Sequence, residues 1–206
     1  MAGDLPGGAP VHVVRESSRN RDLFFAGSEL GLFASLDGGK RWHSIKNGIP
    51  AAVPVYDLVI HPRGRDLVVG KHGRSIYIVD IAPLEELTAK MIESPVHLFA
   101  IKPAFTFKPE EATAPSKNFV GSNPPFGAVI HFYLKEASSA TLTISDESGK
   151  VVRKMEWKPQ IGLRSAVWDL RGDGKGVPLV PPGECTVRLN AGAHVITQKV
   201  KVEAWK

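Results

Sequence analysis

The first part of the chain repeats itself, and this repeat constrains its fold more than any other feature. The stretch "RDLFFAGSELGLFASLD" begins at Arg21, and "RDLVVGKHGRSIYIVD" begins at Arg65. Both contain Arg-Asp-Leu, two apolar residues, a glycine-containing turn, an apolar run and an aspartate. An alternating stretch precedes each copy, "VHVVRES" in the first and "VYDLVIHP" in the second. Because alternation of apolar and polar residues is typical of β-strands, each copy predicts a small sheet.

The spacing of the two copies predicts the kind of sheet. It is close to the period of about 40–45 residues that is typical of a four-stranded β-propeller blade. The strands expected in the first copy are Val11–Glu16, Leu23–Ala26, Gly31–Ser35 and Arg41–Ile45. Those expected in the second copy are Val55–His61, Asp66–Gly70 and Ser75–Ile81. A short helix is expected over "PLEELTAKMIES", and the strand "VHLFAI" after it is expected to complete the second blade.

The stretch "SLDGGKRW", Ser35–Trp42, lies on the hairpin between the third and fourth strands of the first copy. An aspartate at position 37 can accept backbone N–H bonds across a turn, and the glycines after it allow positive φ angles. Ser35 can hydrogen-bond locally, and Trp42 can lay its ring over the turn. The hairpin is therefore predicted to be a folding element. A calcium loop of the EF-hand kind is the alternative, but its later acidic ligands are absent from the sequence.

The chain changes character from about Gly127. Six short alternating stretches come after it: "AVIHFYL", "ATLTISD", "VVRKMEW", "SAVWDL", "ECTVRL" and "HVITQKVKVEA". Turn signals such as "DESGK", "RGDGKG" and "PPG" separate most of them. Closely spaced strands of this kind favour a β-sandwich. We therefore expect an all-β chain with propeller blades over residues 1–101, a linker over 102–124 and an Ig-like or fibronectin-III-like sandwich over 125–206.

Two families resemble this chain. The pattern Ser-x-Asp-x-Gly-x-x-Trp at Ser35, Asp37, Gly39 and Trp42 resembles the Asp-box, or bacterial neuraminidase repeat, of sialidase-like and sortilin-like propellers. In that family the box is a structural element at the blade periphery. The set "NPPFGAVIHFYL", "ISDESGKVVR", "WDLRGDGKG" and "PLVPPGECTVRL" resembles the Ig-like domain of flagellar hook-capping proteins. The resemblance implies the C-terminal part of a larger secreted or periplasmic protein, often of a glycosyl hydrolase-like kind.

Candidate ligand-binding residues can be assigned from the blade geometry. The axial site of a propeller is fed by the loops that join strands 2 to 3 and 4 to 1. The residues available there are Glu29, Tyr56, Asp57, His72 and Arg74. The group "KHGR" suits an anionic ligand, since it places a histidine beside an arginine. The alternative is that His72 and Arg74 only flank a turn that needs its glycine.

Catalysis by this chain alone is not expected. Glycoside hydrolysis needs two carboxylates across a sugar, and sialidases also use an arginine cluster and a Tyr–Glu nucleophile pair. The sequence has no nucleophile elbow, Gly-rich phosphate loop or zinc signature. We therefore assign no catalytic residue, no metal and no cofactor. The expected function is a non-catalytic binding or scaffold module for a glycan or a protein; the alternative is part of a sialidase-like glycoside hydrolase whose catalytic residues lie in missing blades.

Composition limits the partners. The net charge is +5, but Lys and Arg are scattered without a basic stripe, so nucleic-acid binding is not expected. No apolar run is long enough to cross a bilayer, and the N-terminus lacks the pattern of a signal peptide. Taken as written, the chain would stay in the cytoplasm.

A lone Cys185 excludes an internal disulfide and is expected to be a small buried side chain. Two blades would leave apolar surfaces open, which predicts self-association or partner blades.

Overall fold

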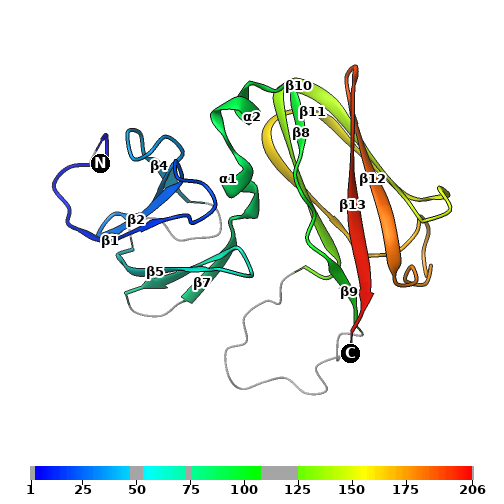
Figure 1. Cartoon of the computed structure of the whole chain (residues 1–206), viewed down its shortest axis with the longest axis horizontal. Helices are drawn as coiled ribbons and strands as arrows, with labels where there is room; N and C mark the ends of the chain where they lie inside the picture. Colours follow the sequence, from blue (N-terminus) through cyan, green and yellow to red (C-terminus); the bar gives the residue numbers. More distant parts are fainter. Residues whose placement is uncertain (1–2, 47–52, 73–75, 108–124, 206) are drawn as a thin grey trace. The chain divides into compact units, whose positions relative to one another are not determined.

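The structure is a computed structural model that describes residues 3–46, 53–72, 76–107 and 125–205. It is mostly β-strand with several antiparallel sheets, and this confirms the predicted all-β class (Figure 1). The chain divides into two compact units, Met1–Ile92 and Glu93–Lys206. Each unit has its own buried core. No helix in the described ranges is long and apolar enough to cross a membrane.

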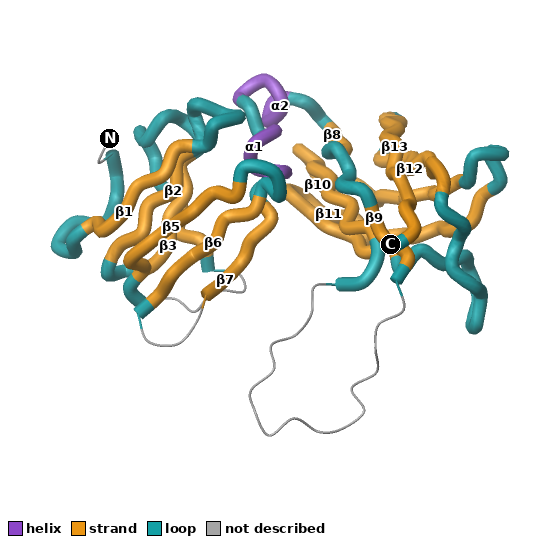
Figure 2. The backbone as a smooth tube through the Cα atoms, turned by 60° about the horizontal axis from the view of Figure 1, so that its bottom comes forward, coloured by secondary structure: helices purple, strands orange, loops and turns teal. Residues whose placement is uncertain are grey.

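Two antiparallel sheets, one from each copy of the repeat, are formed by the residues of the first unit that the structure describes. The first sheet has the order β1-β2-β3-β4, with strands β1 (Val11–Glu16), β2 (Phe24–Ser28), β3 (Gly31–Ser35) and β4 (His43–Ile45). The second sheet has the order β5-β6-β7, with strands β5 (Val55–His61), β6 (Asp66–Lys71) and β7 (Ile76–Asp80) (Figures 1 and 2). These strands agree closely with the expected ones, because the alternating patterns of both copies are clear.

The two sheets of the first unit share one apolar core. Phe25 and Leu32 of the first sheet are buried in the same cluster as Leu58 and Leu67 of the second. Burial of these side chains is the main favourable contribution to the unit's folding. Gly27 lies where β2 approaches β5, and a Cβ atom there would be 2.6 Å from the Val55 side chain. Only glycine fits this approach without a shift of the neighbouring chain.

The outer face of the first sheet has a second, smaller core. Phe24, Phe33 and Trp42 are buried together, and Leu5 from the segment before β1 packs against them. The carboxylate of Asp4 accepts a hydrogen bond from the Trp42 backbone N–H at 2.7 Å. The segment before β1 therefore covers this face of the sheet.

After β7 the chain turns into two short helices, α1 (Ala82–Glu86) and α2 (Ala89–Glu93), where one helix is expected (Figure 2, purple). Glu85 of α1 is buried, accepts a hydrogen bond from the Ser17 hydroxyl at 2.9 Å and pairs with Nε of Arg65 at 2.6 Å. Arg65 has a φ of 55° and also donates to the carbonyl oxygen of Ala82 at 2.8 Å. This network connects the second repeat's Arg-Asp-Leu turn to the helix and to the segment after β1.

The prediction that Val96–Ile101 completes the second blade is wrong. The strand β8 (Val96–Leu98) pairs with β10 of the second unit instead. The expected linker over 102–124 also contains a strand, β9 (Ala104–Thr106), which pairs in parallel with β13. The division between the compact units therefore falls at Ile92 and Glu93, before the expected domain end at 101. Apolar residues that alternate in a short strand do not indicate which sheet buries them.

The described residues of the second unit form a six-stranded sheet, and one apolar core lies against it. The order is β11-β10-β12-β13-β9, with β8 also paired to β10; the long strands are β10 (Ala128–Ser145), β11 (Val151–Trp168), β12 (Gly183–Ala191) and β13 (His194–Ala204). The strands expected at 128–134 and 140–146 are one strand, and those at 151–157 and 165–170 are another. The pairing register shifts between Leu134 and Ser138, which marks an irregularity where two separate strands are expected.

The core of this unit includes Phe132, Trp168 and the single cysteine. Trp168 is fully buried, and its indole N–H donates to the Arg171 carbonyl oxygen at 2.9 Å. Cys185 is a buried free thiol, as expected. Burial raises its pKa, and the nearby carboxylates of Asp146 and Glu147 raise it further.

Candidate functional site

The hairpin over Ser35–Trp42 forms a closed hydrogen-bond network. The buried Ser35 hydroxyl accepts the Gly39 N–H at 2.9 Å and donates to Oδ1 of Asp37 at 2.9 Å. The same carboxylate oxygen accepts the backbone N–H of Lys40 at 3.1 Å and of Arg41 at 2.9 Å. Gly38 and Gly39 have φ angles of 73° and 83°, which other residues adopt only with strain.

The charge of Asp37 is also satisfied within the hairpin. Nε of Arg41 lies 2.9 Å from Oδ2 of Asp37. This side-chain hydrogen bond, together with the Arg41 backbone N–H and the Ser35 hydroxyl, holds the pKa of Asp37 far below its ordinary value. Both carboxylate oxygens therefore bond to the turn itself, and the geometry is that of a structural element.

The structure brings three of the five candidate ligand-binding residues, together with one further histidine, into one group. We call it the first-unit cluster: His12, Glu29, Tyr56 and His72. Nε2 of His12 lies 2.8 Å from Oε1 of Glu29, and the Tyr56 hydroxyl donates to the same oxygen at 3.4 Å. The rings of His12 and Tyr56 have centroids 4.4 Å apart, and those of Tyr56 and His72 are 5.6 Å apart. His12 was not predicted from the sequence, where it is one alternating residue of a strand.

The cluster draws its side chains from separate elements of the first unit. His12 lies on β1, Glu29 on the β2–β3 turn, Tyr56 on β5 and His72 directly after β6. Tyr56 is 46% exposed, so this residue is accessible from outside. The cluster therefore presents hydrogen-bonding groups and aromatic faces together on the surface.

Of the other two candidates, Asp57 does not join the cluster's contacts. Asp57 pairs with the guanidinium of Arg15 at 3.2 Å and accepts the Leu58 N–H at 2.8 Å. Arg74 lies outside the described residues. Within the described part of the chain, no three His, Cys, Asp or Glu side chains gather as a metal-binding group.

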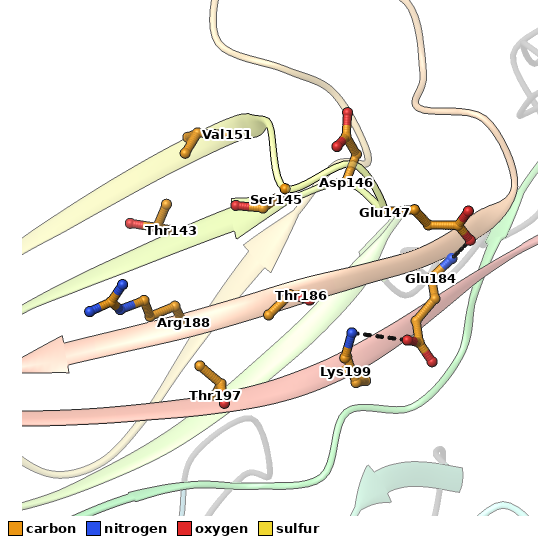
Figure 3. Close-up of a pocket in the computed structure, with 11 residues that line it drawn as sticks. Thr143, Ser145, Asp146, Glu147, Val151, Glu184, Thr186, Arg188, Thr197 and Lys199 are labelled. Carbon is orange, nitrogen blue, oxygen red and sulfur yellow. Dashed lines mark hydrogen bonds and ion pairs between the residues drawn. The ribbon is translucent and has the colours of Figure 1, made fainter.

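A concave region, which the sequence did not predict, lies on the second unit (Figure 3). It is an open hollow of about 550 Å³ over neighbouring strands β10, β12 and β13. Outward-facing polar residues line it, among them Thr143, Ser145, Glu184, Thr186, Arg188, Thr197 and Lys199. The dashed lines in Figure 3 mark the ion pair of Lys199 with Glu184, at 3.0 Å, and the hydrogen bond from the Glu184 N–H to Glu147, at 2.8 Å.

Polar side chains of the "RGDGKG" turn form hydrogen bonds with backbone groups of the second unit. The Arg171 guanidinium donates to the Val177 carbonyl oxygen at 2.6 Å, and Asp173 accepts the Lys154 N–H at 3.2 Å. The polar groups of this turn therefore stabilise the neighbouring backbone.

No protein-family model matches this sequence, and a search of curated proteins finds no significant match.

Proposed function

We propose that this chain is a non-catalytic binding module, composed of Asp-box propeller blades and an Ig-like β-sandwich, that holds a glycan or a partner protein. The observation that carries the proposal is the first-unit cluster. Its groups come from four segments and are accessible, and they offer a carboxylate, a phenol and two imidazoles to a ligand. Such a mixture suits recognition by hydrogen bonds and ring contacts.

Several features support an Asp-box blade in the first sheet. Its strands are arranged in sequential antiparallel order, and the Asp-box hairpin joins the third to the fourth. The apolar faces of the two sheets pack on each other, as neighbouring blades do in a propeller.

One observation favours binding over catalysis. Two carboxylates that act across a glycosidic bond must have defined separate roles as acid and as base or nucleophile. Of the two candidate carboxylates, Asp57 is held by the Arg15 guanidinium and by the Leu58 backbone N–H, outside the contacts of the first-unit cluster.

The test is a titration of the full chain with sialylated and neutral oligosaccharides, monitored by amide chemical shifts. We expect shifts centred on Tyr56 and loss of those shifts in Tyr56→Ala. The matched control is Asp37→Asn, which alters the hairpin and should lower the melting temperature while binding persists. Binding that survives both Tyr56→Ala and Glu29→Gln would contradict the proposal.

The second candidate function is part of a sialidase-like glycoside hydrolase. One contact favours it: the Tyr56 hydroxyl donates to Glu29, as in the Tyr–Glu pair that such enzymes use. The measurement is turnover of an aryl sialoside by the full chain. Turnover that Tyr56→Phe and Glu29→Gln both abolish would replace the binding proposal with this one.

A further inference from the structure

An aromatic surface lies at one end of the second unit's sheet, on residues that the proposed function does not use. It contains Phe105 and Phe107, which lie at alternate positions along and just after β9, and Trp205, which lies directly after β13. Phe105 and Trp205 are perpendicular, with ring centroids 5.9 Å apart, and Phe107 lies 6.0 Å from Trp205. Trp205 is 67% exposed. We call these three residues the aromatic platform.

The platform results from the pairing of β9 with β13. Phe105 is the register partner of Glu203, and the buried Ala104 is the partner of the buried Val202. Successive side chains of a strand point to opposite faces, so Phe105, Glu203 and their i+2 neighbours face outward while Ala104 and Val202 fill the core. A hollow of about 360 Å³ is lined by Phe105, Glu203, Ala204 and Trp205. The rings of Phe105 and Trp205 therefore line an open recess, and Phe107 lies beside Trp205.

The charges beside the platform are balanced. Nζ of Lys201 lies 2.7 Å from Oε1 of Glu203, and both side chains share the outer face with the rings. The next outward residue along β13, Lys199, pairs with Glu184 in the same way. An anionic ligand would meet the two carboxylates, and a cationic ligand would meet the two ammonium groups. A neutral ligand that both donates and accepts hydrogen bonds suits such pairs best.

The outer face of β13 extends from the platform to the polar hollow of Figure 3. Outward positions run from Trp205, directly after β13, through Lys201 and Lys199 to Thr197, and the last two line that hollow. At a rise of about 3.3 Å per residue, these positions extend over roughly 26 Å. Threonine hydroxyls and the two Lys–Glu pairs along this length present donors and acceptors to an extended ligand, and the lining of the hollow adds the Arg188 guanidinium and the carboxylates of Asp146 and Glu147.

We propose that the outer face of β9, β12 and β13 is a binding site for a neutral linear oligosaccharide, with one sugar ring stacked on the aromatic platform. A sugar ring has apolar C–H faces that suit an exposed indole, and its hydroxyl groups suit the Lys–Glu pairs and the threonines. This site shares no residue with the first-unit cluster, so either proposal stands without the other.

The experiment titrates the full chain with neutral hexasaccharides of β-1,4-glucose, α-1,4-glucose, β-1,4-xylose and β-1,4-N-acetylglucosamine. Binding is measured by tryptophan fluorescence and calorimetry. We expect at least one hexasaccharide to bind, with an affinity that barely changes when salt is raised, since the ligand carries no charge. Trp205→Ala and Phe105→Ala should each weaken binding by about tenfold or more, and Trp205→Phe by less.

The matched control is Ile161→Ser, an exposed apolar residue on β11 of the same unit, which should leave the affinity unchanged. Three results would overturn the proposal: none of the four hexasaccharides binds, binding persists in both alanine variants, or the control weakens binding as much as they do. Capture of a charged peptide by the platform in place of a sugar would also overturn it.

Discussion

The outer face of the first sheet carries Phe24, Phe33 and Trp42, which are buried under Leu5, whereas the outer face of the second sheet carries Ile76 and Ile78, which are 74% and 70% exposed. Both sheets come from the same repeated pattern, and their inner faces form one shared core. The difference therefore lies in the residues that come after each copy and in the segments that pack on it. We call the outer surface of β5–β7, with Val59, Val68, Ile76 and Ile78, the open face.

The residues after the shared aspartate explain much of the difference. In the first copy Gly38 and Gly39 come after Asp37, and their positive φ angles turn the chain back into β4. In the second copy Ile81, Ala82 and Pro83 come after Asp80, and the chain enters α1. Proline at the start of a helix is favourable, while a tight hairpin needs residues that tolerate positive φ. Similar strands can thus lead into a fourth strand or into a helix.

The largest expected change in stability comes from a substitution on the outer face of the first sheet, where Trp42 is buried. Trp42→Ala removes the largest side chain of its cluster and should lower the free energy of unfolding of the first unit by about 3–5 kcal/mol. Ile78→Ala on the open face is the matched control and should change it by less than about 0.5 kcal/mol. Hydrogen exchange of the β2 and β3 amides measures both. Equal losses in the two variants would show that the open face is also covered.

A smaller loss of stability is expected from a substitution at Ser35. The equivalent position in the second copy is Ile78. Ser35→Ala leaves the Gly39 N–H without its acceptor in a buried turn and should cost about 1–2 kcal/mol. The control is Ser44→Ala, at an exposed position on β4. Chemical denaturation of the first unit measures the difference. Equal stability of the two variants would mean that the hairpin forms without the serine.

The Asp37 carboxylate predicts a pH dependence. Its pKa is lowered in the folded protein by the hydrogen bonds from Arg41, so its stabilising contribution is fully present above its unfolded pKa and is lost as the pH falls toward the folded value. The melting temperature of Asp37→Asn should therefore lie below that of the wild type at neutral pH, and the gap should narrow below about pH 4. A gap that stays constant down to about pH 3 would rule out this electrostatic contribution.

The smallest effect on stability is expected on the open face. The double variant Ile76→Ser and Ile78→Ser should change the free energy of unfolding by no more than about 0.5 kcal/mol per site. We propose that this face self-associates, because exposed apolar patches mark interfaces or aggregation sites. Light scattering over a concentration series should show assembly of the wild type and its loss in the double variant. Val14→Ser, at an exposed position on β1, is the control; a wild type that stays monomeric would refute the proposal.

The sequence predicted the local elements well and their partners less well. The strands of the repeat, the hairpin after Ser35 and the buried cysteine were predictable, because each depends on residues close together in the chain. The strand that pairs with Val96–Leu98 was not predictable, since the short apolar pattern of this segment fits any sheet with a free edge. The continuous strand β10 was missed because Lys135, Glu136 and Ala137 interrupt the apolar pattern, although the strand continues through them.

The residues of the candidate sites were likewise predictable from local patterns but not from long-range pairing. Loop positions of a blade led to Glu29, Tyr56 and His72, which the structure brings together with His12. The aromatic platform was missed because Phe105 and Trp205 are far apart in the sequence and meet only through the parallel pairing of β9 with β13. An aromatic residue just after a predicted strand does not indicate which distant aromatic residue it will contact.

The buried thiol of Cys185 has a practical consequence. Thiol reagents attack the thiolate, and both the burial of this side chain and its raised pKa suppress that form in the folded protein. Cys185 is the only cysteine of the chain. The rate at which a thiol reagent labels Cys185 therefore measures transient opening of the second unit. At a saturating reagent concentration, this rate equals the rate at which β12 separates from its neighbours. The measurement needs no engineered probe.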